Sequence, residues 1–258
     1  MKNSLAVAQV VLLEMIRRKD FYVLFALTAL ITALMGSVTF FDDPKIARYL
    51  KEVCLALIWV SALFIGIGTA ARQFPAERES RTIFPLMAKP ITRGQVLVGK
   101  FLGCWLATAA GLLVFYLFFG GVVASKEHTL YPVNYFQAWS LHCAMMAVVV
   151  AITLLGSLLL SSVAANLTMT TVLTLGILFV GRHLNKVALQ AGEPVGTLIY
   201  GLYYVIPHLE LFDVRDLLVH NWPAIPWGIW AIALAYAGVY AALLLTGTWL
   251  VLRKKALQ

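Results

Sequence analysis

Residues 72–100 read RQFPAERESRTIFPLMAKPITRGQVLVGK and separate two long apolar runs of the chain. Eight of the chain's 20 basic and 12 acidic residues lie within this stretch. A charged side chain at the centre of a bilayer costs about 2.5–3.5 kcal/mol, so the stretch cannot be part of a membrane span. It therefore divides the chain into spans that precede and spans that follow a polar loop.

The composition points to a membrane protein. The chain has 258 residues, of which 61% are hydrophobic, and its mean hydropathy is +0.86. Only 12% of the residues are charged, about half of the share that is usual in soluble domains. The apolar residues come in unbroken runs that are long enough for helices to cross a bilayer. The sequence therefore predicts an all-α integral membrane protein.

Six apolar runs have the length of a membrane span. They cover residues 21–41, 53–71, 97–123, 140–161, 164–181 and 228–251. An even number of spans places both termini on one side. The N-terminus, the 72–100 stretch and the C-terminal tail hold 13 of the 20 basic residues, and basic residues favour the cytoplasmic side. We therefore expect a multi-pass protein of the inner membrane with both termini in the cytoplasm. The net charge of +8 needs no nucleic-acid partner to explain it.

The spans carry few groups that could do chemistry. Ion-driven carriers place ionisable side chains in the middle of their spans, and here the candidate is His142, near the end of its span. The cysteines Cys54, Cys104 and Cys143 have neither the spacing of a zinc site nor that of a disulfide framework. We therefore expect no catalytic residues and no metal site.

Small residues recur at four-residue spacing in three spans, which lets helix backbones approach closely in lipid. The three stripes are Ala62, Gly66 and Ala70; Gly99, Gly103, Ala107 and Gly111; and Ala233, Ala237 and Ala241. The spacing favours tight packing within one subunit, and it leaves a dimer seam open for one of the stripes.

Residues 94–100 match the G-x-x-x-x-G-K part of a phosphate-binding loop, but position 101 is Phe where the motif needs Ser or Thr to hold Mg²⁺. The motif also requires a preceding buried strand, whereas here a basic segment precedes it and a membrane span follows. We interpret the match as accidental and assign Gly99 to the packing stripe. We expect this chain to bind no nucleotide cofactor itself.

Two segments outside the spans have a helical pattern. Between residues 75 and 89, Pro75 suits a first helical turn and Glu77 and Glu79 follow where the helix dipole favours acidic residues. In residues 1–20 an apolar stripe ends in a basic cluster, which is typical of an interfacial helix. The stripe consists of Leu5, Ala8, Leu12, Met15 and Ile16.

Residues 77–103, ERESRTIFPLMAKPITRGQVLVGKFLG, resemble the cytoplasmic loop of ABC-2 type transporter permeases, in particular the short six-span branch linked to copper-enzyme maturation. The loop of that family reads approximately E-x-E-S-G-T-[IL]-x-x-L-L-[AS]-x-P-[IV]-[ST]-R, followed by G-K. The matching positions are Glu77, Glu79, Ser80, Thr82, Ile83, Leu86, Ala88, Pro90, Ile91, Thr92, Arg93, Gly99 and Lys100. Arg81 departs from the pattern, which usually has Gly there. Residues 203–216, YYVIPHLELFDVRD, are similar to an outer-face proline motif of the family.

The resemblance implies that residues 1–258 form one ABC-2 transmembrane domain, the permease subunit of an ATP-binding-cassette exporter. It implies a partner ATPase in two copies, which binds ATP and Mg²⁺, and a second permease copy or a paralogue. Residues 72–96 would form the coupling loop that contacts the ATPase. The implied contact residues are Glu77, Arg78, Glu79, Arg81, Thr82, Phe84, Lys89 and Arg93. A membrane anchor that recruits a cytoplasmic partner through the same loop, without transport, remains the alternative.

Residues 182–227 form the largest loop on the predicted external side. Within it, residues 195–206 are apolar but too short to span, so we expect a re-entrant or surface-lying helical segment between the fifth and sixth spans. Tyr200, Tyr203, Tyr204 and Pro207 are candidates for an external gate, and an interfacial aromatic belt is the alternative for the tyrosines. In the fifth span, hydroxyls favour a translocation path over a pure anchor, which has no use for them. They belong to Thr168, Thr171 and Thr174.

Overall fold

The structure is a computed structural model of the whole chain, and it describes residues 2–17, 19–37, 44–79, 91–128 and 131–254. All regular elements in these ranges are helices. They are α1 (Lys2–Arg17), α2 (Lys19–Ser37), α3 (Pro44–Ala71), α4 (Pro75–Glu79), α6 (Arg93–Glu127), α7 (Pro132–Leu159), α8 (Val163–Gln190), α9 (Val195–Val205), η2 (Leu209–Phe212), α10 (Arg215–Val219) and α11 (Trp227–Lys254). The prediction of an all-α chain is confirmed for the described residues.

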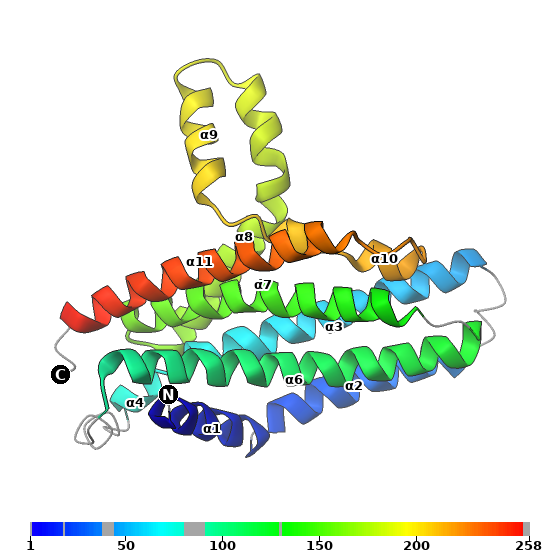
Figure 1. Cartoon of the computed structure of the whole chain (residues 1–258), viewed down its shortest axis with the longest axis horizontal. Coiled ribbons are helices and arrows are strands. Elements are labelled where there is room, and N and C mark those ends of the chain that lie inside the picture. The colour runs from blue at the N-terminus through cyan, green and yellow to red at the C-terminus, as the bar shows by residue number, and fades with distance from the viewer. Residues whose placement is uncertain (1, 18, 38–43, 80–90, 129–130, 255–258) are drawn as a thin grey trace.

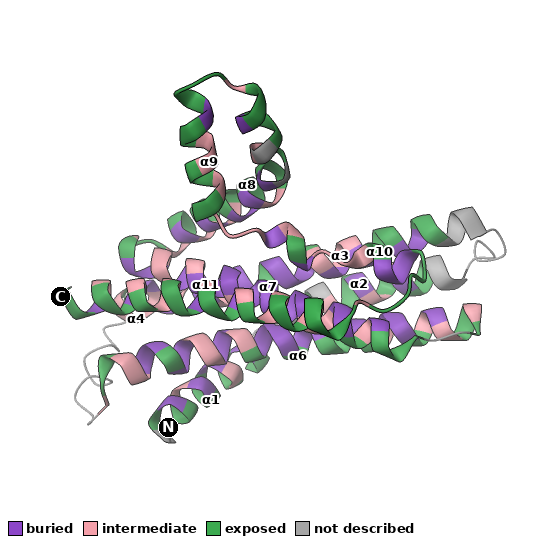
Figure 2. Cartoon of the chain, turned by 45° about the horizontal axis from the view of Figure 1, so that its top comes forward, coloured by how far each residue is buried: buried purple, intermediate pink, exposed green. Residues whose placement is uncertain are grey.

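The long helices α2, α3, α6, α7 and α11 run side by side along the long axis of the molecule, together with the first part of α8 (Figure 1). The chain termini and α4 lie toward the same end of this bundle, which we call the termini end (Figure 1). Helix α7 forms the centre of the bundle. Of its most apolar stretch of 18 residues 78% is buried, whereas the corresponding share of α11 is 11%. Burial is concentrated on the inward faces of α3, α6 and α7 (Figure 2).

Five segments are long and apolar enough to cross a membrane, and the number is six if one bent pair of helices counts as a single span. The five are Arg48–Glu79, Arg93–Glu127, Pro132–Leu159, Val163–Gly181 and Trp227–Lys254. They confirm the predicted spans that begin at residues 53, 97, 140, 164 and 228. The predicted span 21–41 falls on α2, of which the apolar segment Phe25–Leu34 is shorter than a span, while residues 38–41 lie outside the described ranges.

The sixth candidate is the pair Val195–Val205 and Leu209–Val219, bent by 43°. It lies where the sequence predicts a re-entrant segment. Helix α9 and the end of α8 form a hairpin that projects sideways from the bundle (Figure 1), and most of the hairpin is exposed or half-buried (Figure 2). The exposed side chains include Leu198, Leu202 and Val205.

Helix α1 packs along the half of α6 nearest the termini end. A Cβ added to Gly99 would lie 2.6 Å from the Ser4 carbonyl oxygen, and one added to Gly103 would lie 2.6 Å from the Val11 Cβ. Close backbone approach therefore requires glycine at both positions. Gly99 and Gly103, which belong to the small-residue stripe of the third predicted span, thus pack within the subunit. A dimer contact is not needed to explain these two glycines.

The amphipathic pattern of α1 is divided between two surfaces. Ala8, Val11 and Met15 are buried, whereas Leu5 and Ile16 are more than half exposed. Of the predicted apolar stripe, Ala8 and Met15 are therefore buried in the subunit, and Leu5 and Ile16 remain available for the membrane interface.

Candidate functional site

The chain turns sharply where α3 ends at the termini end. The Gln73 N–H donates to the Ala70 carbonyl at 3.2 Å, and the Phe74 side chain is completely buried. Pro75 then begins α4, a position that suits proline because the first turn of a helix has no partner for its N–H groups. The start of α4 is therefore packed into the bundle.

Lys100 joins this corner to α6. Its side chain is only 3% exposed, and its Nζ donates to the Glu77 carboxylate at 2.6 Å and to the Gln73 carbonyl at 2.8 Å. The same nitrogen lies 5.0 Å from the centre of the Phe74 ring. A buried ammonium group is tolerated only when it is paired and hydrogen-bonded, and these partners meet that requirement. We call Gln73, Phe74, Glu77, Arg78 and Lys100 the α4 junction.

The junction also reaches α7, and a side chain of α8 bonds to the adjacent end of α3. Arg78 Nη2 donates to the Leu158 carbonyl near the end of α7 at 3.3 Å. The buried Asn166 side chain donates to the Ala71 carbonyl of α3 and to the Thr153 carbonyl of α7, both at 3.2 Å. The ends of three long helices are thus connected through polar side chains next to α4.

A further contact closes the termini end between α6 and α11. Arg93 Nη1 donates to the Leu252 carbonyl at 2.8 Å and to the Arg253 carbonyl at 3.2 Å. These carbonyls lie in the last turn of α11, where intrahelical partners are missing. Thr92 and Gln95 form a capping box that fixes the start of α6 beside this contact.

The predicted coupling residues have different surroundings. Arg81, Thr82, Phe84 and Lys89 lie outside the described residues. Glu77 and Arg78 face α6 and α7 as described above, whereas Glu79 is exposed. Arg93 contacts the end of α11. Three of the described candidates, Glu77, Arg78 and Arg93, therefore hold helices together. Glu79 and Arg93 are exposed and accessible to a partner.

The stretch that resembles a phosphate-binding loop is helical. Residues 94–100 lie in the first turns of α6, Gly99 packs against α1, and the Lys100 ammonium group is buried against Glu77. A phosphate-binding loop needs free backbone N–H groups in a non-helical turn and an accessible lysine. The geometry of this segment is that of a packing element.

A second concave site lies between α3, α8, η2 and α10, with a volume of about 450 Å³. Its polar part comes from the loop after α9, where Arg215 forms two hydrogen bonds with the Asp213 carboxylate, at 2.8 and 2.9 Å. The Arg215 guanidinium lies 5.2 Å from the centre of the Trp59 ring, and His208 Nδ1 lies 3.2 Å from Glu210 Oε1. We call this cavity the α3–α8 pocket.

The predicted threonines differ in burial along α8. Thr168 is exposed, Thr171 is half-buried, and Thr174 is completely buried with a hydroxyl that has no hydrogen-bond partner among the described residues. The α3–α8 pocket is lined by their neighbours Leu175, Leu178 and Phe179.

The predicted gate residues lie along α9 and the turn that follows it. The Tyr203 ring lies 4.3 Å from the His208 ring and 5.6 Å from the Tyr204 ring, measured between centroids. Helix α11 holds the segment, because Tyr240 donates to the Tyr204 carbonyl at 3.3 Å and Tyr236 accepts from the His208 N–H at 2.9 Å. Tyr200 is half-buried, and Pro207 begins the turn toward η2.

Sequence reasoning missed several residues of these two sites. From the sequence, Lys100 is assigned to the phosphate-loop pattern and to the permease loop motif, without a packing role, and Asn166, Trp59 and Arg215 are not singled out. A lysine or an asparagine inside an apolar run is a usable signal, because such a side chain must find a polar partner within the protein. The identity of that partner could not be predicted, since Lys100 pairs with a residue 23 positions away.

A comparison with protein families gives a match to the family described as ABC-2 family transporter protein, over residues 5–212. A search of curated proteins found no match for the chain. The matched range includes both the α4 junction and the residues of the α3–α8 pocket up to η2. It confirms the resemblance to ABC-2 permeases that residues 77–103 carry in the sequence. The chain belongs to the ABC-2 family of transporter proteins, as a multi-pass membrane component of a transporter.

Proposed function

We propose that this chain is the permease subunit of an ATP-binding-cassette exporter of the inner membrane, with both termini in the cytoplasm. Two copies of a separate ATPase would bind and hydrolyse ATP, and the chain would pair with a second permease copy or a paralogue. Membership of the ABC-2 family supports the role of permease. The export direction and the partners are parts of the proposal.

The observation that carries the proposal is the attachment of α4 to the long helices. Glu77 binds Lys100 of α6, and Arg78 binds the Leu158 carbonyl of α7. A displacement of α4 by a cytoplasmic partner would therefore be transmitted directly to two membrane helices. A loop that served only to recruit a partner would not need to be fixed to the bundle in this way.

Glu79 is the described residue best placed to meet the ATPase. It is exposed at the end of α4, directly before the segment 80–90 that carries the remaining predicted contacts. Charged residues at an interface determine orientation and partner choice as much as affinity. We propose that Glu79 contacts a basic group of the ATPase.

The transport path would pass the α3–α8 pocket. Helix α8 has few neighbours in the subunit, since only 22% of its most apolar window is buried. A second permease copy beside α8 would cover this surface, including Thr168, and would turn the one-sided pocket into a passage between subunits. The projecting α8–α9 hairpin would reach the same neighbour (Figure 1).

The test is co-purification of the ATPase with variants of the chain, together with the rate of ATP hydrolysis. Glu79→Lys should weaken the complex, because loss of a buried charge contact costs about 2–5 kcal/mol. Glu52→Lys is the matched control, since Glu52 is also exposed and lies on α3 far from α4. If Glu79→Lys retains the ATPase as well as the control does, Glu79 is not a contact. If the ATPase binds but its hydrolysis rate is the same with and without the chain, the chain is an anchor and not a permease.

A further inference from the structure

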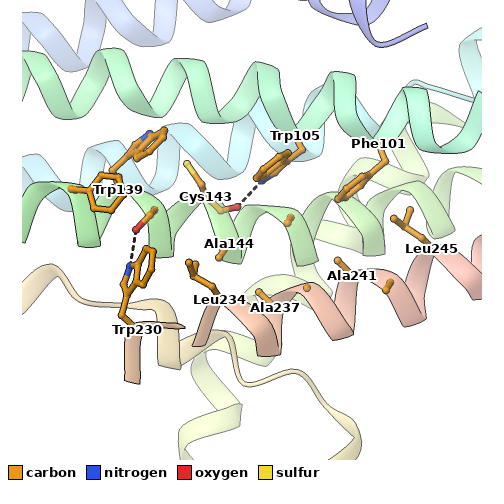
Figure 3. Close-up of a pocket in the computed structure, with 15 residues that line it drawn as sticks. Phe101, Trp105, Trp139, Cys143, Ala144, Trp230, Leu234, Ala237, Ala241 and Leu245 are labelled. Atoms are coloured by element: carbon orange, nitrogen blue, oxygen red, sulfur yellow. Dashed lines mark hydrogen bonds between the residues drawn. The ribbon is translucent and has the colours of Figure 1, made fainter. Parts of the chain in front are cut away.

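A third concave site has no role in the proposed transport. It is a groove between α6, α7 and α11 with a volume of about 640 Å³. Phe101, Trp105, Trp139 and Trp230 provide aromatic walls, and small residues such as Ala237 and Ala241 provide the surface between them (Figure 3). We call it the α6–α11 groove.

The aromatic walls present carbon surface and no free hydrogen-bond donors. Trp105 Nε1 donates to the Cys143 carbonyl at 2.8 Å, and Trp230 Nε1 donates to Ser140 Oγ at 2.9 Å (Figure 3). Trp139 Nε1 donates to the Ala109 carbonyl at 3.3 Å. Since all three indole N–H groups are satisfied within the protein, the groove offers dispersion and hydrophobic contacts. An occupant of matching chemistry is a hydrocarbon chain.

The length of the groove suits a hydrocarbon chain. Its lining on α11 extends from Trp230 to Leu245, which is roughly 22 Å along a helix axis. One leaflet of the hydrocarbon core is roughly 15 Å thick, so an acyl chain can lie along the groove.

Positive charge lies beyond the groove at the termini end, where Trp249 and Arg253 follow Leu245 on α11 at four-residue spacing. Trp249 lies five residues before the end of α11, and its indole nitrogen is 3.6 Å from the position of a Cβ on Gly94 of α6. The Arg253 guanidinium lies 5.6 Å from the centre of the Trp249 ring, and Lys254 is exposed next to it. Arg93 adds a third cation at this point through its bonds to the end of α11.

These cations lie beyond the groove, toward the end of α11 at the membrane surface. Eight residues separate Leu245 from Arg253, roughly 12 Å along the helix. A phosphate head group lies in the polar layer outside the hydrocarbon core, and each such layer is roughly 5–8 Å thick. We propose that the α6–α11 groove binds an acyl chain of an anionic phospholipid, whose phosphate group contacts Arg253 and Lys254. The lipid belongs to the leaflet at the termini end.

The experiment is native mass spectrometry of the full chain in detergent, titrated separately with phosphatidylglycerol and phosphatidylcholine. The wild-type chain should retain phosphatidylglycerol at lower lipid concentration than phosphatidylcholine. The double variant Arg253→Gln/Lys254→Gln should remove this preference. Its affinity for phosphatidylglycerol should fall by about fivefold for each basic residue that is replaced.

A second pair of variants tests the groove itself. A Cβ on Gly238 meets open space, so Gly238→Leu fills the groove without disturbing the packing of α11. Gly247→Leu is the matched control, since a Cβ there also meets nothing within 4 Å and Gly247 does not line the groove. Gly238→Leu should weaken phosphatidylglycerol binding at least about fivefold, because it displaces several methylene groups of the lipid. Ala242→Leu, which also lines the groove, should act in the same way.

Three results would overturn the proposal. The first is equal retention of the two lipids by the wild-type chain, which would show adventitious detergent-like binding. The second is an equal effect of the groove variants and the Gly247 control. The third is a change in oligomeric mass with Gly238→Leu while lipid retention is unchanged, which would identify the groove as a contact between copies of the chain.

Discussion

Lys100 is a charged residue within an apolar helix, and its environment explains why the sequence tolerates it. The Glu77 carboxylate, the Gln73 carbonyl and the Phe74 ring surround the ammonium group. Glu77 itself is partly accessible, with 28% of its side chain exposed. The burial of the Lys100–Glu77 pair is thus intermediate. Disruption of a fully buried ion pair is costly, whereas a surface ion pair contributes little to stability.

The first prediction is a double-mutant cycle on this pair. Lys100→Met should destabilise the chain by about 1–3 kcal/mol, because it leaves Glu77 without its counter-charge. Glu77→Gln should cost less, since the amide oxygen can still accept from Lys100. The double variant Lys100→Met/Glu77→Gln should be more stable than Lys100→Met alone. The measurement is the midpoint of thermal unfolding in detergent.

Strictly additive effects of the two substitutions would show that the ion pair does not form in the protein. Glu79→Gln is the matched control. Glu79 is exposed, so this substitution should leave the midpoint of thermal unfolding unchanged.

Glu77 and Glu79 are only two positions apart and look equivalent in the sequence. A helix of five residues is too short for a periodic pattern to show which of them faces the bundle, so the sequence could not distinguish their roles.

At the scale of elements, the packing of α1 on α6 depends on two glycines. The second prediction is that Gly103→Ala displaces α1, because the added Cβ would lie 2.6 Å from the Val11 Cβ and 3.0 Å from the Ala8 carbonyl oxygen. Backbone amides of α1 should then exchange hydrogen faster, while those of α7 keep their protection. Gly121→Ala is the control on the same helix, since its Cβ would meet nothing within 4 Å. Equal exchange in α1 for both variants would contradict the packing described for Gly103.

The positions of most long helices were predictable from apolar runs, because each run must match the thickness of a bilayer. The ends were less predictable. The third predicted span begins at residue 97, whereas α6 begins at Arg93, since the Thr92–Gln95 capping box extends the helix into polar sequence. Helix α8 continues to Gln190, beyond the predicted end at residue 181, because its last turns pack against α9 in the hairpin. Such tertiary contacts are not encoded in local hydropathy.

At the scale of the whole molecule, the arrangement of termini gives the third prediction. A reporter fused after Gln258 should be active in the cytoplasm, and one inserted at residue 130 should be active on the opposite side. The reason is that the start of α1 and the end of α11 lie toward the same end of the bundle (Figure 1). In the sequence, the N-terminal segment, residues 72–100 and the C-terminal tail hold 13 of the 20 basic residues, which favour the cytoplasmic side. Alkaline phosphatase activity from the fusion after Gln258 would mean that the chain is inserted in the reverse orientation.

The candidate site was only partly predictable at this scale. The resemblance of residues 77–103 to ABC-2 permeases identified the loop, and the family match agrees with it. The α3–α8 pocket was not predictable, because it brings together Trp59, Leu178 and Arg215 from segments more than 30 residues apart. Its polar part depends on the fold of the loop after α9, which no periodic pattern specifies.

The central claim is that the α4 junction transmits the action of an ATPase to the transport path. The most direct measurement is the labelling rate of Leu178→Cys by a membrane-impermeant maleimide, since Leu178 lines the α3–α8 pocket. The three native cysteines, all of them buried, are first replaced by alanine. The chain is purified with its ATPase and labelled with and without ATP. We predict that ATP changes the labelling rate several-fold, and that Lys100→Met abolishes this change although the ATPase remains bound. Two results would contradict the claim. One is an equal effect of ATP on the labelling rate in Lys100→Met, and the other is no effect of ATP when the ATPase is bound to the chain with the unsubstituted junction.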